Sequence, residues 1–192
     1  MQLINRNMII LNKEINELDK FVLEFVDIIK KYTNYIIISG YVAILLGRTR
    51  GTDDIDMIIP IISFESFSLL YKELLEKGFW SLNSSKATDL YELLLHRSSV
   101  RFAMEPLISP NMEIKFSKNM YDQISLKSPV IIKLGEYELK TSQLELQIAY
   151  KEEVLKSNKD MEDAKHIRLI GKQILDESLI RQYKQQLRDF DG

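Results

Sequence analysis

Two aspartates separated by one apolar residue, in the segment Asp54-Ile55-Asp56, have the clearest potential for chemistry. On a β-strand, residues i and i+2 point to the same face, so the two carboxylates would project side by side. Carboxylates this close repel each other unless a cation lies between them. Mg²⁺ binds through a few carboxylate oxygens and keeps its other positions for water and substrate phosphate. The spacing therefore predicts a site for Mg²⁺ or Mn²⁺; a solvated acidic strand end beside Arg48 and Arg50 is the alternative.

A second feature lies upstream, where a short apolar strand ends at Ser39-Gly40 and a helix is predicted to follow. Small residues at this point leave the backbone N–H groups of the helix start open to an anion, which is a geometry suited to phosphate. A basic turn then leads to the strand of Asp54 and Asp56. The order of these features predicts a phosphate-binding site at Ser39-Gly40 (the phosphate seat) and a metal-binding site at Asp54 and Asp56, on adjacent strands.

The segment from Ser39 to Gly47, followed by Arg50-Gly51-Thr52-Asp53-Asp54-Ile55-Asp56, resembles the signature of the DNA polymerase β-type nucleotidyltransferase superfamily. More narrowly it is similar to the abortive-infection type IV toxin group (AbiEii-like) and its small archaeal relatives. The family pattern has Gly where Ser39 stands. Two further matches to the toxin group follow in order, a Gln-x-x-x-Lys motif at Gln147 to Lys151 and an Asp-x-x-Asp motif at Asp160 to Asp163.

This resemblance implies a metal-dependent transfer of a nucleoside monophosphate from a nucleoside triphosphate to an acceptor hydroxyl or phosphate. A third carboxylate is expected from a later strand; Glu113 is the best candidate, with Glu105 and Asp89 as alternatives. The metal ligands would be Asp54, Asp56 and Glu113, and the catalytic set these three with Lys151. The nucleotide-binding residues would be Ser39, Gly40, Arg50, Thr52, Lys151 and Asp160.

The elements around these motifs predict an α+β protein, with a small mixed sheet flanked by helices and a helical C-terminal part. Residues 1–141 form the predicted nucleotidyltransferase-like core and 142–192 a helical region packed on it. Helices are expected over 12–32, 41–46, 64–76, 89–96, 142–156, 159–171 and 176–189. Strands are expected over 34–39, 55–59, 100–104, 112–116, 130–134 and 137–139, with a short one within 77–83. Ser142 and Glu145 have the spacing of a capping box at a helix start.

Composition limits the function classes. The 192 residues include 45% apolar and 28% charged residues, typical of an ordinary globular chain, and the net charge of −2 gives no global field for a polyanion. There is no cysteine and no apolar run long enough to span a bilayer, so we expect a cytoplasmic protein without a membrane partner.

Two readings from other classes stay open beside the enzyme. One is a catalytically inactive nucleotide-binding module that keeps the fold. The other is one component of a two-protein toxin–antitoxin or defence system, in which an antitoxin-like protein covers the site. The sequence does not define the acceptor of an active enzyme; RNA and protein are the candidates.

Overall fold

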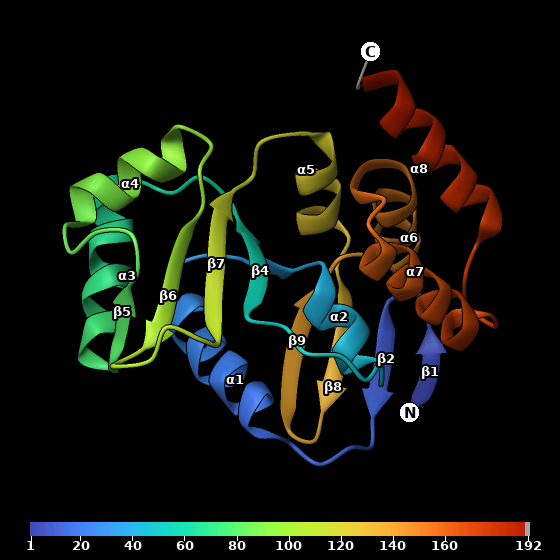
Figure 1. Ribbon diagram of the computed structural model, residues 1–192, viewed down its shortest axis with the longest axis horizontal. Helices are drawn as coiled ribbons and strands as arrows, with labels where there is room; N and C mark the ends of the chain where they lie inside the picture. The colour runs from blue at the N-terminus through green and yellow to red at the C-terminus, as the bar shows by residue number, and fades with distance from the viewer. Residues whose placement is uncertain (191–192) are drawn as a thin grey trace.

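A nine-stranded mixed β-sheet organises the chain in the computed structural model, which describes residues 1–190 (Figure 1). Its spatial order is β1-β2-β8-β9-β3-β4-β7-β6-β5. The strands are β1 (Gln2–Asn5), β2 (Met8–Leu11), β3 (Ile36–Ile37), β4 (Asp54–Ile59), β5 (Phe79–Ser81), β6 (Val100–Met104), β7 (Asn111–Phe116), β8 (Val130–Leu134) and β9 (Tyr137–Thr141). β-Branched and aromatic residues dominate them, as expected for strands that pack on both faces.

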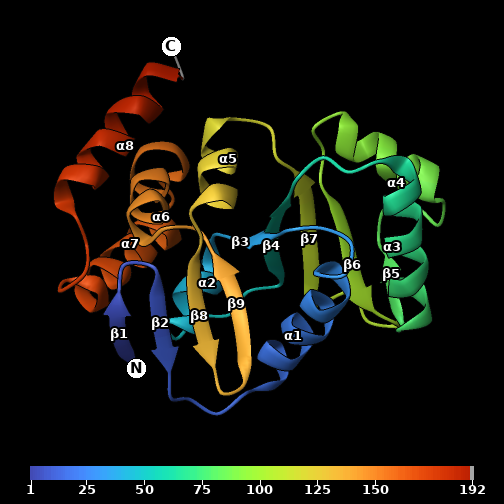
Figure 2. The ribbon, with the colours of Figure 1, turned by 180° about the vertical axis from the view of Figure 1, so that it is seen from behind.

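Helices cover both faces of the sheet. They are α1 (Glu17–Ile29), α2 (Gly40–Leu45), α3 (Phe64–Glu76), α4 (Ala87–Leu95), α5 (Met120–Lys127), α6 (Leu144–Tyr150), the π-helix η1 (Lys151–Leu155), α7 (Asn158–Gly171) and α8 (Glu177–Phe190). Helix α2 lies on the face of the sheet that is toward the viewer in Figure 1. Helix α1 lies on the opposite face, which is toward the viewer in Figure 2. Within residues 1–190, no helix is long and apolar enough to cross a membrane.

The centre of the sheet positions the predicted site. β4 lies between β3 and β7; it runs antiparallel to β3 and parallel to β7. The register of the parallel pair places Asp54 opposite Asn111 and Asp56 opposite Glu113. Ile55 and Met57 alternate with the aspartates and are fully buried. Core packing of the apolar face therefore directs the acidic face of β4 to the opposite side.

The expected α+β class, with a mixed sheet, flanking helices and a helical C-terminal part, is confirmed. The sheet is larger than predicted because β1 and β2 were not expected, and helix α5 was not expected either. These elements give weak signals: β1 is mostly exposed, β2 has four residues, and α5 is only weakly amphipathic. Strand β2 pairs with β8, and this tertiary contact stabilises a strand that its own sequence pattern does not predict.

Two expectations for the C-terminal helices are wrong. The single helix expected over 142–156 is α6 followed by the π-helix η1. The capping box of Ser142 and Glu145 does not form, since α6 begins after Gln143 and has no side-chain cap. Glu145 is buried, and its Oε1 instead accepts a hydrogen bond from the Asp176 backbone N–H at 3.1 Å. Its carboxylate therefore holds the segment that leads into α8.

Candidate active site

Asp54 and Asp56 lie on one face of β4, two residues apart, and both are half-buried. The Asn111 amide holds Asp54 from the neighbouring strand, because its Nδ2 donates to Asp54 Oδ1 at 2.8 Å. The Thr52 hydroxyl donates to the Asp54 backbone oxygen at 2.8 Å. Both contacts fix the start of β4, so the orientation of the Asp54 carboxylate is set before any ligand binds.

The carboxyl group of Asp56 has a shifted pKa. Burial raises the pKa of its carboxyl above the usual range, and the nearby charges of Glu113 and Asp54 add to that rise. A hydrogen bond from Ser39 and the charge of Lys115 act in the opposite direction. The charged form of Asp56 is therefore disfavoured in the folded protein, and a cation bound near it would stabilise that form.

Glu113 lies on β7 directly opposite Asp56, but its carboxylate is already engaged. Its Oε2 accepts a hydrogen bond from Arg101 Nε at 2.8 Å, across the antiparallel pair of β6 and β7. Burial raises the pKa of Glu113, but hydrogen bonds from Ser99 and Arg101 outweigh it and lower the pKa overall. A low pKa makes Glu113 a weak base. The alternatives Glu105 and Asp89 lie elsewhere, after β6 and on α4.

Ser39 forms the corner between β3 and α2 in a conformation that favours glycine, with φ of 66°. This is the position at which the resembling family has Gly. The Ser39 backbone N–H donates to Gln147 Oε1 at 3.2 Å, which links the corner to α6. The Ser39 hydroxyl interacts with Asp56, so the backbone and the side chain of Ser39 connect α6 with the acidic face of β4.

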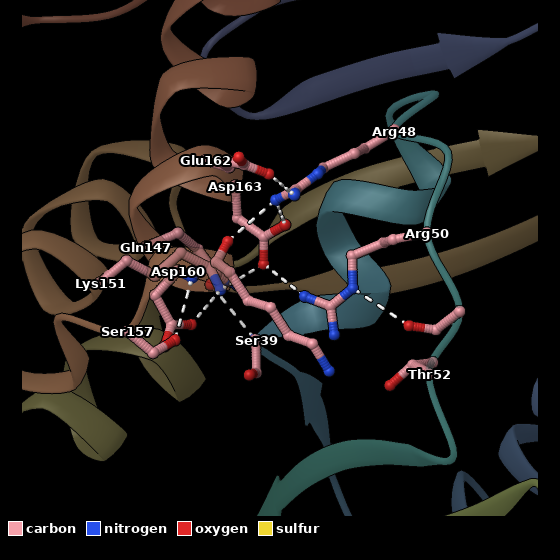
Figure 3. A network of polar contacts seen from close by, with 12 residues as sticks. Ser39, Arg48, Arg50, Thr52, Gln147, Lys151, Ser157, Asp160, Glu162 and Asp163 are labelled. Carbon is pink, nitrogen blue, oxygen red and sulfur yellow. Dashed lines mark hydrogen bonds and ion pairs between the residues drawn. The ribbon is translucent and has the colours of Figure 1, made fainter.

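The helical tail reaches this corner through a buried ion-pair cluster centred on Asp163 (Figure 3). Asp163 is fully buried, and its Oδ2 lies 2.8 Å from Lys151 Nζ and 2.8 Å from Arg50 Nη1. Its Oδ1 pairs with Arg48. Lys151 is 1% exposed and also pairs with Asp160 at 3.1 Å. The tail motifs thus meet the basic turn that precedes β4.

Arg50 connects this cluster to Gly40. A Cβ atom added at Gly40 would lie 2.9 Å from Arg50 Nη2, so only glycine leaves room for the guanidinium over the first residue of α2. Arg50 is in turn fixed by Asp163 and by the Gly51 carbonyl, at 3.2 Å from Nε. The close approach places a cation beside the predicted phosphate seat.

A cavity of about 240 Å³ lies between the acidic face of the sheet and the C-terminal helices. Asp56 and Ser39 line it from the sheet side, and Gln147 and Lys151 line it from α6 and η1. Its walls also include apolar and aromatic side chains: Ile38, Ile58, Tyr121, Leu146, Tyr150 and Leu155. Polar and apolar side chains share the lining about equally, and polar groups that converge on one cavity are typical of a small-molecule site.

Of the predicted site residues, Ser39, Asp56 and Lys151 line this cavity, and Asp160 contacts Lys151. Asp54 follows Thr52 at the start of β4, and Arg50 lies over Gly40. Glu113 is in register with Asp56 but turned to Arg101. Asp54, Gly40, Arg50, Thr52 and Glu113 do not line the cavity.

Asp54 and Asp56 are the carboxylates that β4 presents on one face for a divalent metal ion. Residues 1–190 contain no group of three or more His, Cys, Asp or Glu side chains placed to hold a metal. Mg²⁺ commonly takes only one or two protein carboxylates together with substrate phosphates, and Asp54 and Asp56 fit that requirement. Glu113 does not contribute while it is paired with Arg101.

Sequence reasoning missed three residues of this region. Asn111 gives no signal of its own, since its contact with Asp54 depends on the register of two strands. Arg48 was noted only as a basic neighbour, although it pairs with Asp163 from 115 residues away. Asp163 closes the Asp-x-x-Asp motif, and the spacing of three residues, which places both acids on one helix face, was the available signal.

No protein-family model matches the chain, and no curated protein matches its sequence. Among solved structures it is similar to the crystal structure of an antigenic nucleotidyltransferase-like protein from Paracoccidioides brasiliensis. The match covers 88% of this chain and 85% of the other, with a TM-score of 0.52 and 13% sequence identity. The chain has a nucleotidyltransferase-like fold. At this identity the likeness concerns the fold, and the nucleotidyltransferase-like fold by itself does not define a substrate or an acceptor.

Proposed function

We propose that this chain is a divalent-metal-dependent nucleotidyltransferase. The observation that carries the proposal is that three segments meet at one cavity: the Ser39 corner, the acidic face of β4, and the helical segment from Gln147 to Lys151. Each segment holds one of the motifs that resemble the superfamily. A packing appendage would have no reason to bury Lys151 beside that corner.

In the proposed reaction, an acceptor oxygen attacks the α-phosphorus of a nucleoside triphosphate, and the bond from that phosphorus to the bridging oxygen breaks to release pyrophosphate. The acceptor hydroxyl gives up its proton to solvent, because Asp56 would be a ligand of the divalent ion and Glu113 has a lowered pKa. Asp54 and Asp56 would hold the divalent ion, which neutralises phosphate charge when bound. A phosphate would contact the Ser39 hydroxyl or Lys151 by replacing a present partner, Asp56 for the hydroxyl and Asp160 or Asp163 for the ammonium.

The finer proposal is that the chain belongs with the AbiEii-like toxin group and transfers the nucleotide to RNA or protein. It is supported by the contact between the two tail motifs, where Lys151 pairs with both Asp160 and Asp163. An antitoxin-like partner follows from the same resemblance. The division at residue 141 into a core and a helical region is likewise proposed.

One observation favours a second function, a nucleotide-binding module without turnover. Glu113, the expected third carboxylate, is bonded to Arg101 and has a lowered pKa. A module of this kind would bind a nucleoside triphosphate and release it unchanged.

The test is to incubate the chain with Mg²⁺, each nucleoside triphosphate labelled at the α-phosphate, and total RNA or total protein. Transfer of label to either fraction supports the enzyme, and its loss in Asp54→Asn and Asp56→Asn assigns it to this site. Asp53→Asn is the matched control, since Asp53 is an exposed neighbour whose side chain contacts Ser109 and not the cavity. Saturable nucleotide binding with no transfer favours the binding module, and no binding at all contradicts both.

A further inference from the structure

Two polar groups in the cavity have hydrogen-bonding capacity that the protein does not use. Gln147 is 5% exposed and lines the cavity, and its Nε2 has no partner within the described residues. Its Oε1 accepts the Ser39 N–H, which fixes the orientation of the amide and leaves Nε2 as the free donor. A buried donor without a partner is costly, and in a cavity it indicates a ligand acceptor.

Lys115 is the second group. It lies on β7 two residues beyond Glu113, is half-buried and lines the same cavity. Within residues 1–190 its ammonium makes no ion pair within 4.0 Å and no side-chain hydrogen bond. Most half-buried lysines of the chain do have such contacts; Lys140, for example, donates to Asn34 Oδ1 at 2.7 Å.

These two groups reach the cavity from different elements, β7 and α6, and the Lys115 ammonium and the Gln147 Nε2 are both donors only. A ligand that satisfies both must present acceptor oxygens, and the ammonium favours an anion. Asp56 and Asp122 also line the cavity, and Asp122 already accepts the Lys118 N–H at 2.8 Å. The charge of Lys151 is balanced by its two aspartates. The charge of Lys115 acts on the nearby Asp56 and Glu113, but Lys115 is the cavity cation without a direct ion pair among the described residues.

We infer that Lys115 and Gln147 together bind a phosphate group. Charge-assisted hydrogen bonds from an ammonium and an amide are suited to phosphate oxygens. The group can come from the polyphosphate of the nucleotide or from a phosphate of the acceptor, and this choice of source rests on the proposed function. The binding itself needs only the two donors.

The probe is inorganic tripolyphosphate, titrated calorimetrically into the whole chain with and without Mg²⁺. Lys115→Gln should weaken its affinity by about tenfold or more, the order of a charge-assisted hydrogen bond. Lys115→Met, which keeps the aliphatic stem, is a second neutral variant, and Lys115→Arg should retain binding. Gln147→Glu keeps the acceptor for the Ser39 N–H while it replaces the free donor by a carboxylate, so it should also weaken binding. Lys140→Gln is the control, with the same change of charge outside this cavity.

Absence of tripolyphosphate binding to the unmodified chain, or unchanged affinity in the Lys115 and Gln147 variants, overturns the inference. The latter result would mean that Lys115 only balances the charge of Asp56 and Glu113. Displacement of tripolyphosphate by a non-hydrolysable nucleoside triphosphate assigns the phosphate to the nucleotide; simultaneous binding assigns it to the acceptor. Binding that depends on Lys115 without any nucleotidyl transfer keeps the inference and rejects the proposed enzyme. Nucleotidyl transfer that does not depend on Lys115 supports the proposed enzyme and rejects the inference.

Discussion

Lys151 Nζ lies 2.8 Å from Asp163 Oδ2, and both side chains are removed from solvent. A carboxylate in this position needs its cations, because an uncompensated buried charge is far more costly than the pair itself is favourable. Asp163 is therefore the residue on which the junction between the tail and the basic turn of Arg48 and Arg50 depends.

Replacement of Asp163 by Asn should lower the free energy of unfolding by about 3–5 kcal/mol, since it leaves Lys151, Arg48 and Arg50 without their shared partner. Urea unfolding followed by circular dichroism measures this change. Glu162→Gln is the control: its side chain is 72% exposed and pairs with Arg48 at the surface, so its loss should cost less than about 1 kcal/mol. Equal losses for the two variants would contradict the central role of Asp163.

The double variant Lys151→Met with Asp163→Asn should be less destabilised than the sum of the two single variants. Each single change leaves the other buried charge with one partner fewer: Asp163 keeps Arg48 and Arg50, and Lys151 keeps Asp160. The double change removes both members of the pair, so the loss of their contact is not counted twice. A double-mutant cycle in urea gives the coupling energy, which we expect to exceed about 1 kcal/mol. Additive effects would mean that the two side chains act independently.

Gly40→Ala should destabilise the chain by about 1 kcal/mol, because the new methyl group displaces the end of the flexible Arg50 side chain and weakens its ion pair with the buried Asp163. Gly51→Ala is a matched control, since a Cβ there meets nothing within 4 Å, and we expect a change within about 0.5 kcal/mol. Thermal unfolding of both variants, at one scan rate, tests the difference. A Gly40→Ala protein as stable as Gly51→Ala would rule out the steric role of Gly40.

Asp56→Asn should raise the melting temperature near neutral pH. The folded-state pKa of Asp56 is raised, first of all by burial, so its ionisation opposes folding as pH rises from the unfolded-state pKa through the folded-state pKa. The stabilising effect of the substitution should therefore shrink on acidification below that window. Melting curves across acidic pH for wild type and variant test the sign, and a constant difference at all pH values would contradict it.

Arg101→Met should strengthen the binding of Mn²⁺, because it releases the Glu113 carboxylate and removes a positive charge near Asp54 and Asp56. Calorimetric titration of Mn²⁺ measures the affinity. The gain should disappear in the double variant Arg101→Met with Glu113→Gln. If the double variant keeps the gain, the loss of cationic repulsion alone explains it.

The strands and helices with strong periodicity could be predicted from sequence: Phe64–Glu76, Val100–Met104 and Val130–Leu134 have the expected bounds. The placement of Asp54 and Asp56 on one strand face follows from a two-residue period. The ion pair of Arg101 with Glu113 could not be predicted, because it depends on which strand lies beside β7 and in which register. The roles of Glu113, Lys151 and the other site residues stay predictions.

The strand order has a consequence for synthesis of the chain on the ribosome. The hairpin of β1 and β2 and the pair of β3 and β4 emerge early, but β8 and β9 separate them in the finished sheet. The nascent chain must therefore hold two unjoined fragments until residues 130–141 leave the exit tunnel and bridge them. The hydrogen bond from the Ser39 N–H to Gln147 forms later still. A chain that begins to fold during translation thus completes its cavity last, when its C-terminal helices have been made.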